Sequence, residues 1–274
     1  MTSPPSPELT LENWLREASA VLAFCGAGVS AESGVPTFRG AGGLWEGHRV
    51  EDVATPEAFE QDPRTVWRFY AARQEALQRV EPNPAHAVLA AMEERYPEFL
   101  LVTQNVDNLH ERAGSRKLIK LHGSLMEVRC TRCETVTPLR EPVSLAGIEG
   151  GELPHCDCSG LLRPNVVWFG EALNPHHFEQ IDRFFRRCPA PLAAARPALL
   201  LIIGTSGTVS GGYGITPLAR RFGARVVEIN PEASAFSGSV DLAVREPAGA
   251  LLGRVWARVT AERLLYPGAE PPSR

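Results

Sequence analysis

The sequence has no apolar run long enough to cross a membrane, and it has no excess of basic charge. The longest apolar stretch, Ala198–Ile203, has the length of a buried strand, whereas a membrane helix needs about 20 apolar residues. The 28 Lys and Arg residues are outnumbered by 32 Asp and Glu residues, which argues against a nucleic-acid-binding protein. The first ten residues carry three prolines and lack the basic and apolar regions of a signal peptide, so we expect a cytoplasmic protein.

Short apolar runs alternate with helical patterns along the chain, and the overall composition is that of a globular protein. This alternation predicts an α/β fold, a Rossmann-like parallel sheet with helices on both faces. Ligands of such sheets bind beyond the carboxyl ends of the strands, where polar motifs follow the apolar runs here. The predicted strands cover residues 21–24, 99–103, 198–204 and 225–229, and the predicted helices cover 9–20, 63–80, 85–95, 175–187 and 216–222.

Four of the six cysteines form two close pairs, separated by 22 residues: Cys130 with Cys133, and Cys156 with Cys158. In a cytosolic protein this spacing favours a metal over disulfides, and four thiolates predict a closed, structural zinc site. The second pair has one intervening residue where two are usual, which leaves His155 as an alternative fourth ligand. We expect residues 123–164 to form a small inserted zinc-binding module.

A glycine-rich segment follows the first predicted strand: residues 26–40 read GAGVSAESGVPTFRG. Glycines let backbone N–H groups approach phosphates closely, so the segment indicates a nucleotide-binding loop. It is neither the Gly-x-Gly-x-x-Gly dinucleotide motif, since it continues into Pro-Thr-Phe-Arg, nor a P-loop. The whole string resembles the sirtuin family, in which this loop wraps the pyrophosphate and ribose of NAD. The resemblance implies that Phe38 covers the ribose face from which nicotinamide leaves.

Two further strings resemble sirtuin motifs. Residues 103–110 read TQNVDNLH, with Val106 where isoleucine is usual, and residues 121–124 read LHGS. By this resemblance Asn105 and His122 are catalytic, with His122 as the general base, a role that suits an imidazole because its pKa lies near neutral pH. The resemblance covers roughly residues 13–260. The cofactor contacts that it implies are Gly26, Ala27, Gly28, Ser30, Phe38, Arg39, Gln104, Asn105, Val106, Asp107, Gly204, Thr205, Ser206, Asn230, Pro231, Glu232 and Ala248.

The resemblance implies that NAD is a reactant and not a hydride carrier. The acyl oxygen of an acyl-lysine attacks the ribose, nicotinamide leaves, and the acyl group is released as O-acyl-ADP-ribose. The substrate is expected to bind as an extended strand along residues 166–171, VVWFGE. The residues expected to contact the substrate are Ala54, Tyr70, Arg73, Val167, Phe169 and Gly170.

The acyl group itself is indicated by Tyr70 and Arg73, which lie three residues apart on one predicted helix face. A phenol and a guanidinium can bind a distal carboxylate, and the small Ala54 leaves room for a longer acyl chain. The three positions resemble the sirtuin subclass that removes succinyl and malonyl groups. A glycine-rich stretch at residues 207–212 departs from the family where a bulkier residue and a proline are expected.

Two other functions use the same nucleotide loop: a protein mono-ADP-ribosyltransferase and a non-catalytic NAD-sensing module. An NAD-linked dehydrogenase is disfavoured because the loop lacks the standard motif. We expect a monomer that binds acyl-lysine proteins and neither nucleic acid nor membrane. The predicted organisation is an NAD-binding domain of residues 9–40, 85–122 and 165–263, a helical acyl-pocket insertion of 41–84, the zinc module of 123–164, and flexible termini of 1–8 and 264–274.

Overall fold

The computed structural model describes residues 5–37, 44–45, 48–188, 197–209 and 213–265. The strands of its main sheet cover Ala20–Cys25 (β1), Glu98–Thr103 (β4), Leu118–Lys120 (β5), Ala198–Ile203 (β9), Arg225–Ile229 (β10) and Leu242–Val244 (β11). They lie in the order β11-β10-β9-β1-β4-β5, and every neighbouring pair is parallel. The predicted parallel α/β sheet is confirmed.

Strand β1 lies at the centre of the sheet and is buried on both faces. Val21, Ala23 and Cys25 contribute to the hydrophobic core on one face, and the alternate residues Leu22 and Phe24 contribute to the core on the other. A strand that is buried on both sides needs a continuous apolar run, which is what the sequence shows. The strand ends at Cys25, so the glycine-rich loop begins at the carboxyl edge of the sheet.

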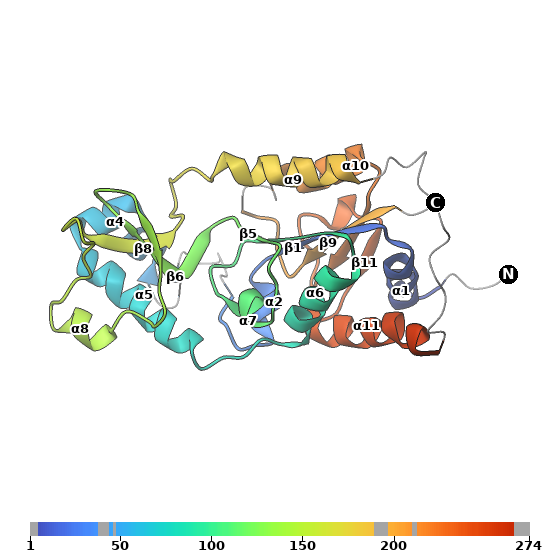
Figure 1. Cartoon of the computed structure of the whole chain (residues 1–274), viewed down its shortest axis with the longest axis horizontal. Helices are drawn as coiled ribbons and strands as arrows, with labels where there is room; N and C mark the ends of the chain where they lie inside the picture. Colours follow the sequence, from blue (N-terminus) through green and yellow to red (C-terminus); the bar gives the residue numbers. More distant parts are fainter. Residues whose placement is uncertain (1–4, 38–43, 46–47, 189–196, 210–212, 266–274) are drawn as a thin grey trace.

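Helices cover both faces of the main sheet (Figure 1). Helix α1 (Pro7–Glu17), α6 (Pro84–Arg95) and α11 (Ala248–Leu265) pack on the face of Val21 and Ala23. Helices α9 (Pro175–Arg187) and α10 (Ile215–Arg221) pack on the opposite face. Among the described helices, none is long and apolar enough to cross a membrane.

A second, smaller unit lies at the end of the molecule away from α1 (Figure 1). Its antiparallel sheet has the order β7-β6-β8 and shares a hydrophobic core with the helices of residues 50–77. Its elements are α3 (Val50–Val53), α4 (Pro56–Gln61), α5 (Pro63–Leu77), β6 (Gly123–Cys130), β7 (Val136–Pro138), α8 (Leu145–Glu149) and β8 (Leu162–Val166). The remaining short elements are α2 (Gly28–Ala31), β2 (Leu44–Trp45), β3 (His48–Arg49), α7 (Leu109–Arg112) and the 3₁₀ helix η2 (Ser237–Ser239).

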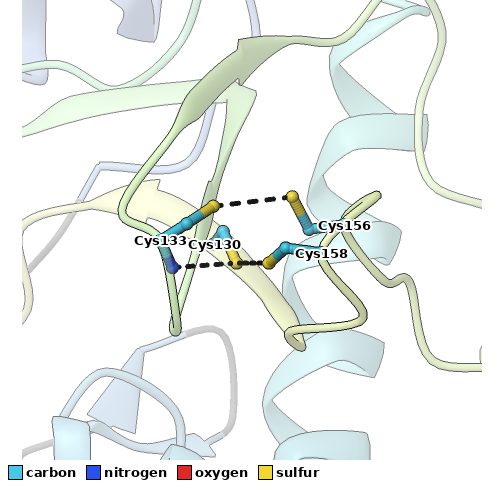
Figure 2. Close-up of side chains that lie close together, drawn as sticks. All are labelled: Cys130, Cys133, Cys156 and Cys158. Atoms are coloured by element: carbon cyan, nitrogen blue, oxygen red, sulfur yellow. Dashed lines mark hydrogen bonds between the residues drawn. The ribbon is translucent and has the colours of Figure 1, made fainter.

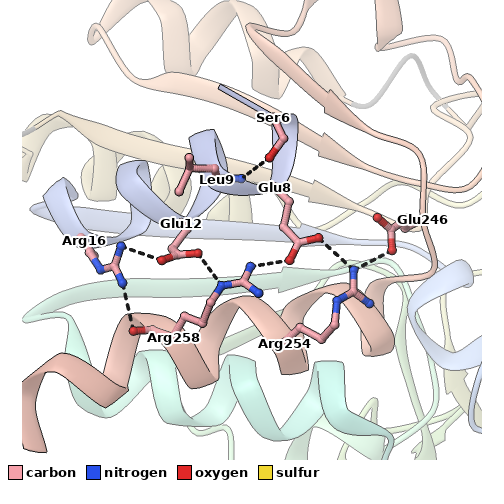
Figure 3. Close-up of polar contacts among 8 residues, drawn as sticks. All are labelled: Ser6, Glu8, Leu9, Glu12, Arg16, Glu246, Arg254 and Arg258. Carbon is pink, nitrogen blue, oxygen red and sulfur yellow. Dashed lines mark hydrogen bonds and ion pairs between the residues drawn. The ribbon is translucent and has the colours of Figure 1, made fainter. Parts of the chain in front are cut away.

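Charged side chains join the first helix of the chain to the last (Figure 3). Arg258 of α11 donates to Glu12 of α1 at 2.5 Å and also pairs with Glu8. Arg254 bridges Glu8 at 3.1 Å and a further carboxylate, Glu246, at 2.8 Å. The arginines hold the pKa of Glu8 below its ordinary value, chiefly through the hydrogen bond from Arg258. The network therefore ties together two helices that are about as far apart in sequence as the chain allows.

The structure extends the predicted elements in three places. Strands β5 and β11 add an edge on each side of the sheet, and each is too short to give an alternating pattern. Helix α11 was not predicted, although Leu251, Leu252, Val255 and Val259 are buried at helical spacing. Helix α1 begins at Pro7 and α11 ends at Leu265, inside the termini that were predicted to be flexible.

Candidate active site

The glycine-rich loop packs directly against the end of the neighbouring strand β9. A Cβ atom at Gly28 would lie 2.7 Å from the Cα of Gly204, and one at Gly26 would lie 2.6 Å from the Cβ of Thr205. Gly204 itself has φ of +60°, and the N–H of Gly28 donates to its carbonyl at 2.7 Å. Glycine is thus required on both sides of this contact, which keeps the edge of the sheet open for a ligand.

A cavity of about 230 Å³ lies beside this contact, beyond the ends of β9 and β10. It is lined by residues from four separate predicted contact segments, and these include Gly28, Gly204, Pro231 and Ala248. Its walls are small or apolar, apart from the carboxylate of Glu32, which accepts from the N–H of Gly249 at 2.8 Å. The cavity has the position and lining expected for the adenosine half of a dinucleotide.

Ser30 is the centre of a buried polar network between the glycine-rich loop and the segment after β4. Its hydroxyl donates to Asp107 at 3.0 Å and accepts from the side-chain amide of Asn105 at 3.1 Å. All three residues are buried. The network fixes the Asp107 carboxylate and the Asn105 amide at the end of β4, so both groups are oriented before any ligand binds.

His86 is the next side chain in contact with Ser30. The N–H of Asn83 donates to its Nδ1 at 3.2 Å, so Nε2 carries the proton and faces the Ser30 hydroxyl at 3.4 Å. Burial lowers the pKa of His86 to about 4, which keeps the ring neutral at physiological pH. The neighbouring His110, with its ring centroid 4.7 Å away, is also buried, and burial lowers its pKa well below the ordinary value. Both histidines are buried and lie behind the Ser30 network.

Gln104 and Asn230 meet at Thr205. The Gln104 side-chain amide donates to the Thr205 hydroxyl at 3.0 Å, and the Asn230 amide donates to the Thr205 carbonyl at 3.2 Å. The ends of β4, β9 and β10 are therefore linked by side chains that were all predicted to contact NAD. Ser206 and Glu232 lie further out and are exposed, with the Ser206 hydroxyl 2.8 Å from that of Thr208.

His122 follows β5 and lies between the main sheet and the smaller unit. Burial lowers its pKa below the ordinary value, and a hydrogen bond with the backbone of Gln104 raises it only partly. The Nε2 atom of His122 lies 2.7 Å from the hydroxyl of Tyr213.

The backbone around His122 is fixed by its neighbours in β6 and β8. The N–H of Val167 donates to the His122 carbonyl at 2.9 Å. Gly123 has φ of +79°, and a Cβ atom there would lie 2.1 Å from the carbonyl oxygen of Asn165. The string Leu-His-Gly therefore has a structural reason: only glycine lets the chain turn tightly after His122.

The predicted acyl-pocket residues Ala54 and Tyr70 come together around Trp168. Tyr70 is fully buried, and the indole N–H of Trp168 donates to its hydroxyl at 2.9 Å. The N–H of Phe169 donates to the Ala54 carbonyl at 3.0 Å. Arg73 lies on the same helix with its guanidinium 5.2 Å from the centre of the Phe69 ring. Helix α5 and the segment after β8 thus form one wall of the site.

Trp168 is held in place by an ion pair. Arg163 donates to both carboxylate oxygens of Glu171, at 2.6 and 2.8 Å, and its guanidinium stacks 3.4 Å from the centre of the Trp168 ring. The same carboxylate accepts from the N–H of Trp168 at 2.8 Å. Burial raises the pKa of Glu171, but the hydrogen bonds of Arg163 and the Trp168 N–H outweigh it, so the net shift is downward.

The expected peptide-binding segment lies at an open edge. Strand β8 pairs only with β6 in the described sheet, and the chain continues from it through Val167 to Phe169 and Gly170. Phe169 is 49% exposed, and nothing lies within 4 Å of a Cβ placed at Gly170. An extended peptide can therefore pair along this edge.

The four predicted metal ligands come together at the end of β6 and the loop before β8 (Figure 2). The sulfur atoms of Cys130 and Cys158 are 3.5 Å apart, those of Cys133 and Cys156 are 3.7 Å apart, and all four lie within 4.8 Å of one another. Zinc bound tetrahedrally at about 2.3 Å requires sulfur atoms about 3.8 Å apart. The cluster fits a structural zinc ion.

The short Cys156–Cys158 spacing does not exclude either ligand. The backbone turns back at Ser159, which has φ of +65°, and Gly160 leaves the sulfur of Cys130 room that a Cβ would fill at 2.6 Å. His155 is not part of the cluster, since its Nδ1 lies 2.8 Å from the carbonyl oxygen of Leu153.

Phe38 and Arg39 lie outside the described residues, as do residues 210–212 of the glycine-rich stretch. The Val106 carbonyl accepts from the N–H of Leu125 at 2.8 Å, which ties the loop after β4 to β6. Ala27 caps the short helix α2 within the nucleotide loop.

The sequence did not indicate three of the residues that shape the site. Asn83 has a recognisable signal, because an N-cap asparagine followed by Pro84 is typical of a helix start. Arg163 and Tyr213 have none, since each acts on a partner that the fold alone brings near.

Comparisons with known proteins agree with this geometry. A family model described as the Sir2 family matches residues 26–211. An NAD-dependent protein deacylase of Pyrococcus abyssi (strain GE5 / Orsay) is 43% identical over 242 residues, which cover 88% of this chain and 93% of the relative. The structure of a Sir2 homolog–NAD complex superposes with a TM-score of 0.82 at 38% identity, covering 96% of this chain and 97% of that one. A Sir2 protein bound to an acetylated peptide superposes with a TM-score of 0.76 at 27% identity, covering 93% and 98% of the two chains.

Proposed function

Because this chain belongs to the Sir2 (sirtuin) family and is an NAD-dependent protein deacylase, we propose that it removes succinyl and malonyl groups from lysine, and acetyl groups as well. The observation that supports this proposal is that Ala54 and Tyr70 share one hydrophobic core and that Arg73 lies on the same helix as Tyr70. A succinyl or malonyl group ends in a carboxylate, so its recognition needs donors and positive charge at the bottom of an otherwise apolar pocket.

Tyr70 is suited to donate to such a carboxylate. Burial raises its pKa to about 12, although the hydrogen bond from Trp168 and the charge of Arg73 oppose the shift. The phenol therefore stays protonated at neutral pH. Its oxygen accepts from Trp168, and no described residue accepts its proton, so the O–H remains available to a ligand.

Arg73 supplies the charge that an acyl carboxylate needs. The charge of Arg73 acts on the Tyr70 hydroxyl, so the guanidinium lies near the phenol, one helical turn along α5. A guanidinium that binds a carboxylate in a partly buried site contributes more than a surface pair, because the bonds are charge-assisted. The small side chain of Ala54 leaves room for a longer acyl chain.

We further propose that His122 is the general base and that Asn105 and Asp107 position the reacting groups. NAD, when bound, supplies the ribose carbon that accepts the acyl oxygen, with nicotinamide as the leaving group. This role needs the neutral tautomer with its lone pair on Nε2, the ring atom that faces the Tyr213 hydroxyl. Nε2 is then the atom that takes the proton of a ribose hydroxyl. The hydrogen bonds of Ser30 hold the side chains of Asn105 and Asp107 in fixed orientations.

The acyl preference is tested with Arg73→Met, which removes the charge and keeps the apolar stem. We expect kcat/KM for a succinyl-lysine peptide to fall about 10- to 100-fold, the cost of one buried charged hydrogen-bond partner, with deacetylation largely retained. Arg68→Met, on the exposed side of the same helix, is the matched control. An equal loss of desuccinylation and deacetylation in Arg73→Met would contradict the pocket assignment.

The reaction itself is tested by mass spectrometry of the products. With an acyl-lysine peptide and NAD we expect nicotinamide, deacylated peptide and O-acyl-ADP-ribose, and neither of the last two products with His122→Tyr. Transfer of ADP-ribose to protein, without acyl loss, would instead indicate a mono-ADP-ribosyltransferase.

A further inference from the structure

Tyr213 makes a contact that the proposed reaction leaves unexplained. Its hydroxyl lies 2.7 Å from Nε2 of His122, and the two rings meet edge to face with their centroids 6.1 Å apart. As the proposed general base, the neutral His122 ring carries its lone pair on Nε2. The Tyr213 hydroxyl is therefore the donor in this bond.

The surrounding structure specifies the position of the tyrosine ring. Phe24 of β1 and Phe178 of α9 pack against it, with centroids 6.5 and 5.8 Å away. The Tyr213 backbone has φ of +57°, a left-handed conformation that a bulky residue adopts only where packing requires it. These contacts come from the core on the α9 side of the sheet, so the phenol is aimed at His122 by the fold.

The bond has a consequence for the cofactor. A general base takes a proton from a group within hydrogen-bond reach, about 2.6–3.2 Å, and the Tyr213 oxygen already fills that position at Nε2. A ribose hydroxyl and the phenol are the same kind of donor and cannot both occupy the lone pair. We propose that Tyr213 is a positioning residue for the deacylase reaction: in the ligand-free enzyme its phenol occupies the ribose-hydroxyl position at His122 and thereby lowers the affinity for NAD.

This inference rests on the proposed role of His122 as the general base. Binding of the ribose must first break the Tyr213–His122 bond. The apparent association constant for NAD is therefore the intrinsic constant multiplied by the fraction of enzyme in which Nε2 is free of the phenol. Removal of the phenol oxygen leaves Nε2 without a partner until the ribose arrives. The change therefore favours the bound state.

The test is Tyr213→Phe, which keeps the ring and its aromatic packing. Calorimetric titration with ADP-ribose and with ADP separates the effect, because only ADP-ribose carries the second ribose. We expect Tyr213→Phe to bind ADP-ribose about 5-fold more tightly than the wild type, the free energy of one neutral hydrogen bond, with ADP affinity unchanged. In steady-state assays the KM for NAD should fall by a similar factor.

Two controls keep the result interpretable. Tyr96→Phe removes a buried tyrosine hydroxyl far from the site, where it donates to the Leu15 carbonyl, and should change neither affinity. In a His122→Ala background, Tyr213→Phe should no longer change ADP-ribose affinity, which a double-mutant cycle measures directly.

An ADP-ribose affinity that is unchanged or weaker in Tyr213→Phe would overturn the inference. So would a lower kcat with an unchanged KM for NAD, because that result would place Tyr213 in the proton-transfer path. Failure of the proposed function is a separate outcome, seen as wild-type enzyme that releases no nicotinamide with any acyl peptide, whereas the ADP-ribose titration needs no turnover.

Discussion

At the scale of single residues, Gly123 shows how the position of His122 depends on backbone geometry. Alanine at this position would adopt φ of +79° with its Cβ 2.1 Å from the Asn165 oxygen, so β6 and β8 would have to separate. We expect Gly123→Ala to lower the free energy of unfolding by about 3 kcal/mol, the sum of backbone strain and the clash, and to reduce deacylation strongly. Thermal or denaturant unfolding measures the first effect.

Gly238→Ala is the control, because nothing lies within 4 Å of a Cβ there. An equal stability of the two variants would contradict the close approach between Gly123 and Asn165.

The residues of the site were predictable to different degrees. Gln104, Asn105 and Asp107 stand directly after an apolar run, and a parallel sheet brings such residues to its carboxyl edge whatever the rest of the chain does. The contacts that position the predicted side chains were not predictable, and the contact of His122 is an example. Tyr213 is 91 positions from His122, and only the packing of α9 and β1 around its ring brings it to Nε2.

At the scale of elements, the contact between α1 and α11 is a part of the fold that the sequence pattern did not predict. Glu12 is buried between the helices, where it pairs with Arg16 at 2.7 Å and with Arg258 (Figure 3). A pattern search finds α1 from its apolar face. It does not find the pairing of its acidic residues with arginines at the other end of the chain. Strands β5 and β11 were not predicted, because a strand of three residues is too short to show an alternating pattern.

The ion pairs predict a pH dependence of stability. Burial raises the pKa of Glu12, but the bonds of Arg258 and Arg16 outweigh it, so the pKa in the folded protein is below its unfolded value. A carboxyl group of this kind stabilises the fold above its unfolded pKa and loses that contribution as the pH falls through the folded pKa. Glu12→Gln should therefore lower the free energy of unfolding by about 1 kcal/mol at pH 7 and by less at pH 3.

Glu51→Gln provides the comparison, because Glu51 and its partner Arg49 are both largely exposed, and no change is expected at either pH. A Glu12→Gln deficit that is equally large at pH 3 and pH 7 would show that shape, and not charge, holds the two helices together.

At the scale of the whole molecule, strands β6 and β8, which flank the cysteine cluster, share one hydrophobic core with the proposed acyl-pocket residues Ala54 and Tyr70. Strand β8 is also linked to α5, since the indole N–H of Trp67 on α5 donates to the Leu162 carbonyl at 2.8 Å. Four thiolates without a metal repel one another, so loss of zinc is expected to release the loops that begin β8 and end β6. The effect should then reach α5, Tyr70 and the substrate edge through this shared core.

We therefore expect about one zinc per chain by elemental analysis, and a lower unfolding midpoint after chelation. Cys158→Ser should bind less zinc and lose deacylation, while Cys188→Ala, at a buried cysteine that ends α9 and lies outside the cluster, should keep its zinc. ADP-ribose should still bind the metal-free protein, because its cavity is lined by the main sheet and by α2 and α11. Loss of ADP-ribose affinity on chelation would contradict this separation, since it would show that the zinc cluster also stabilises the nucleotide half of the molecule.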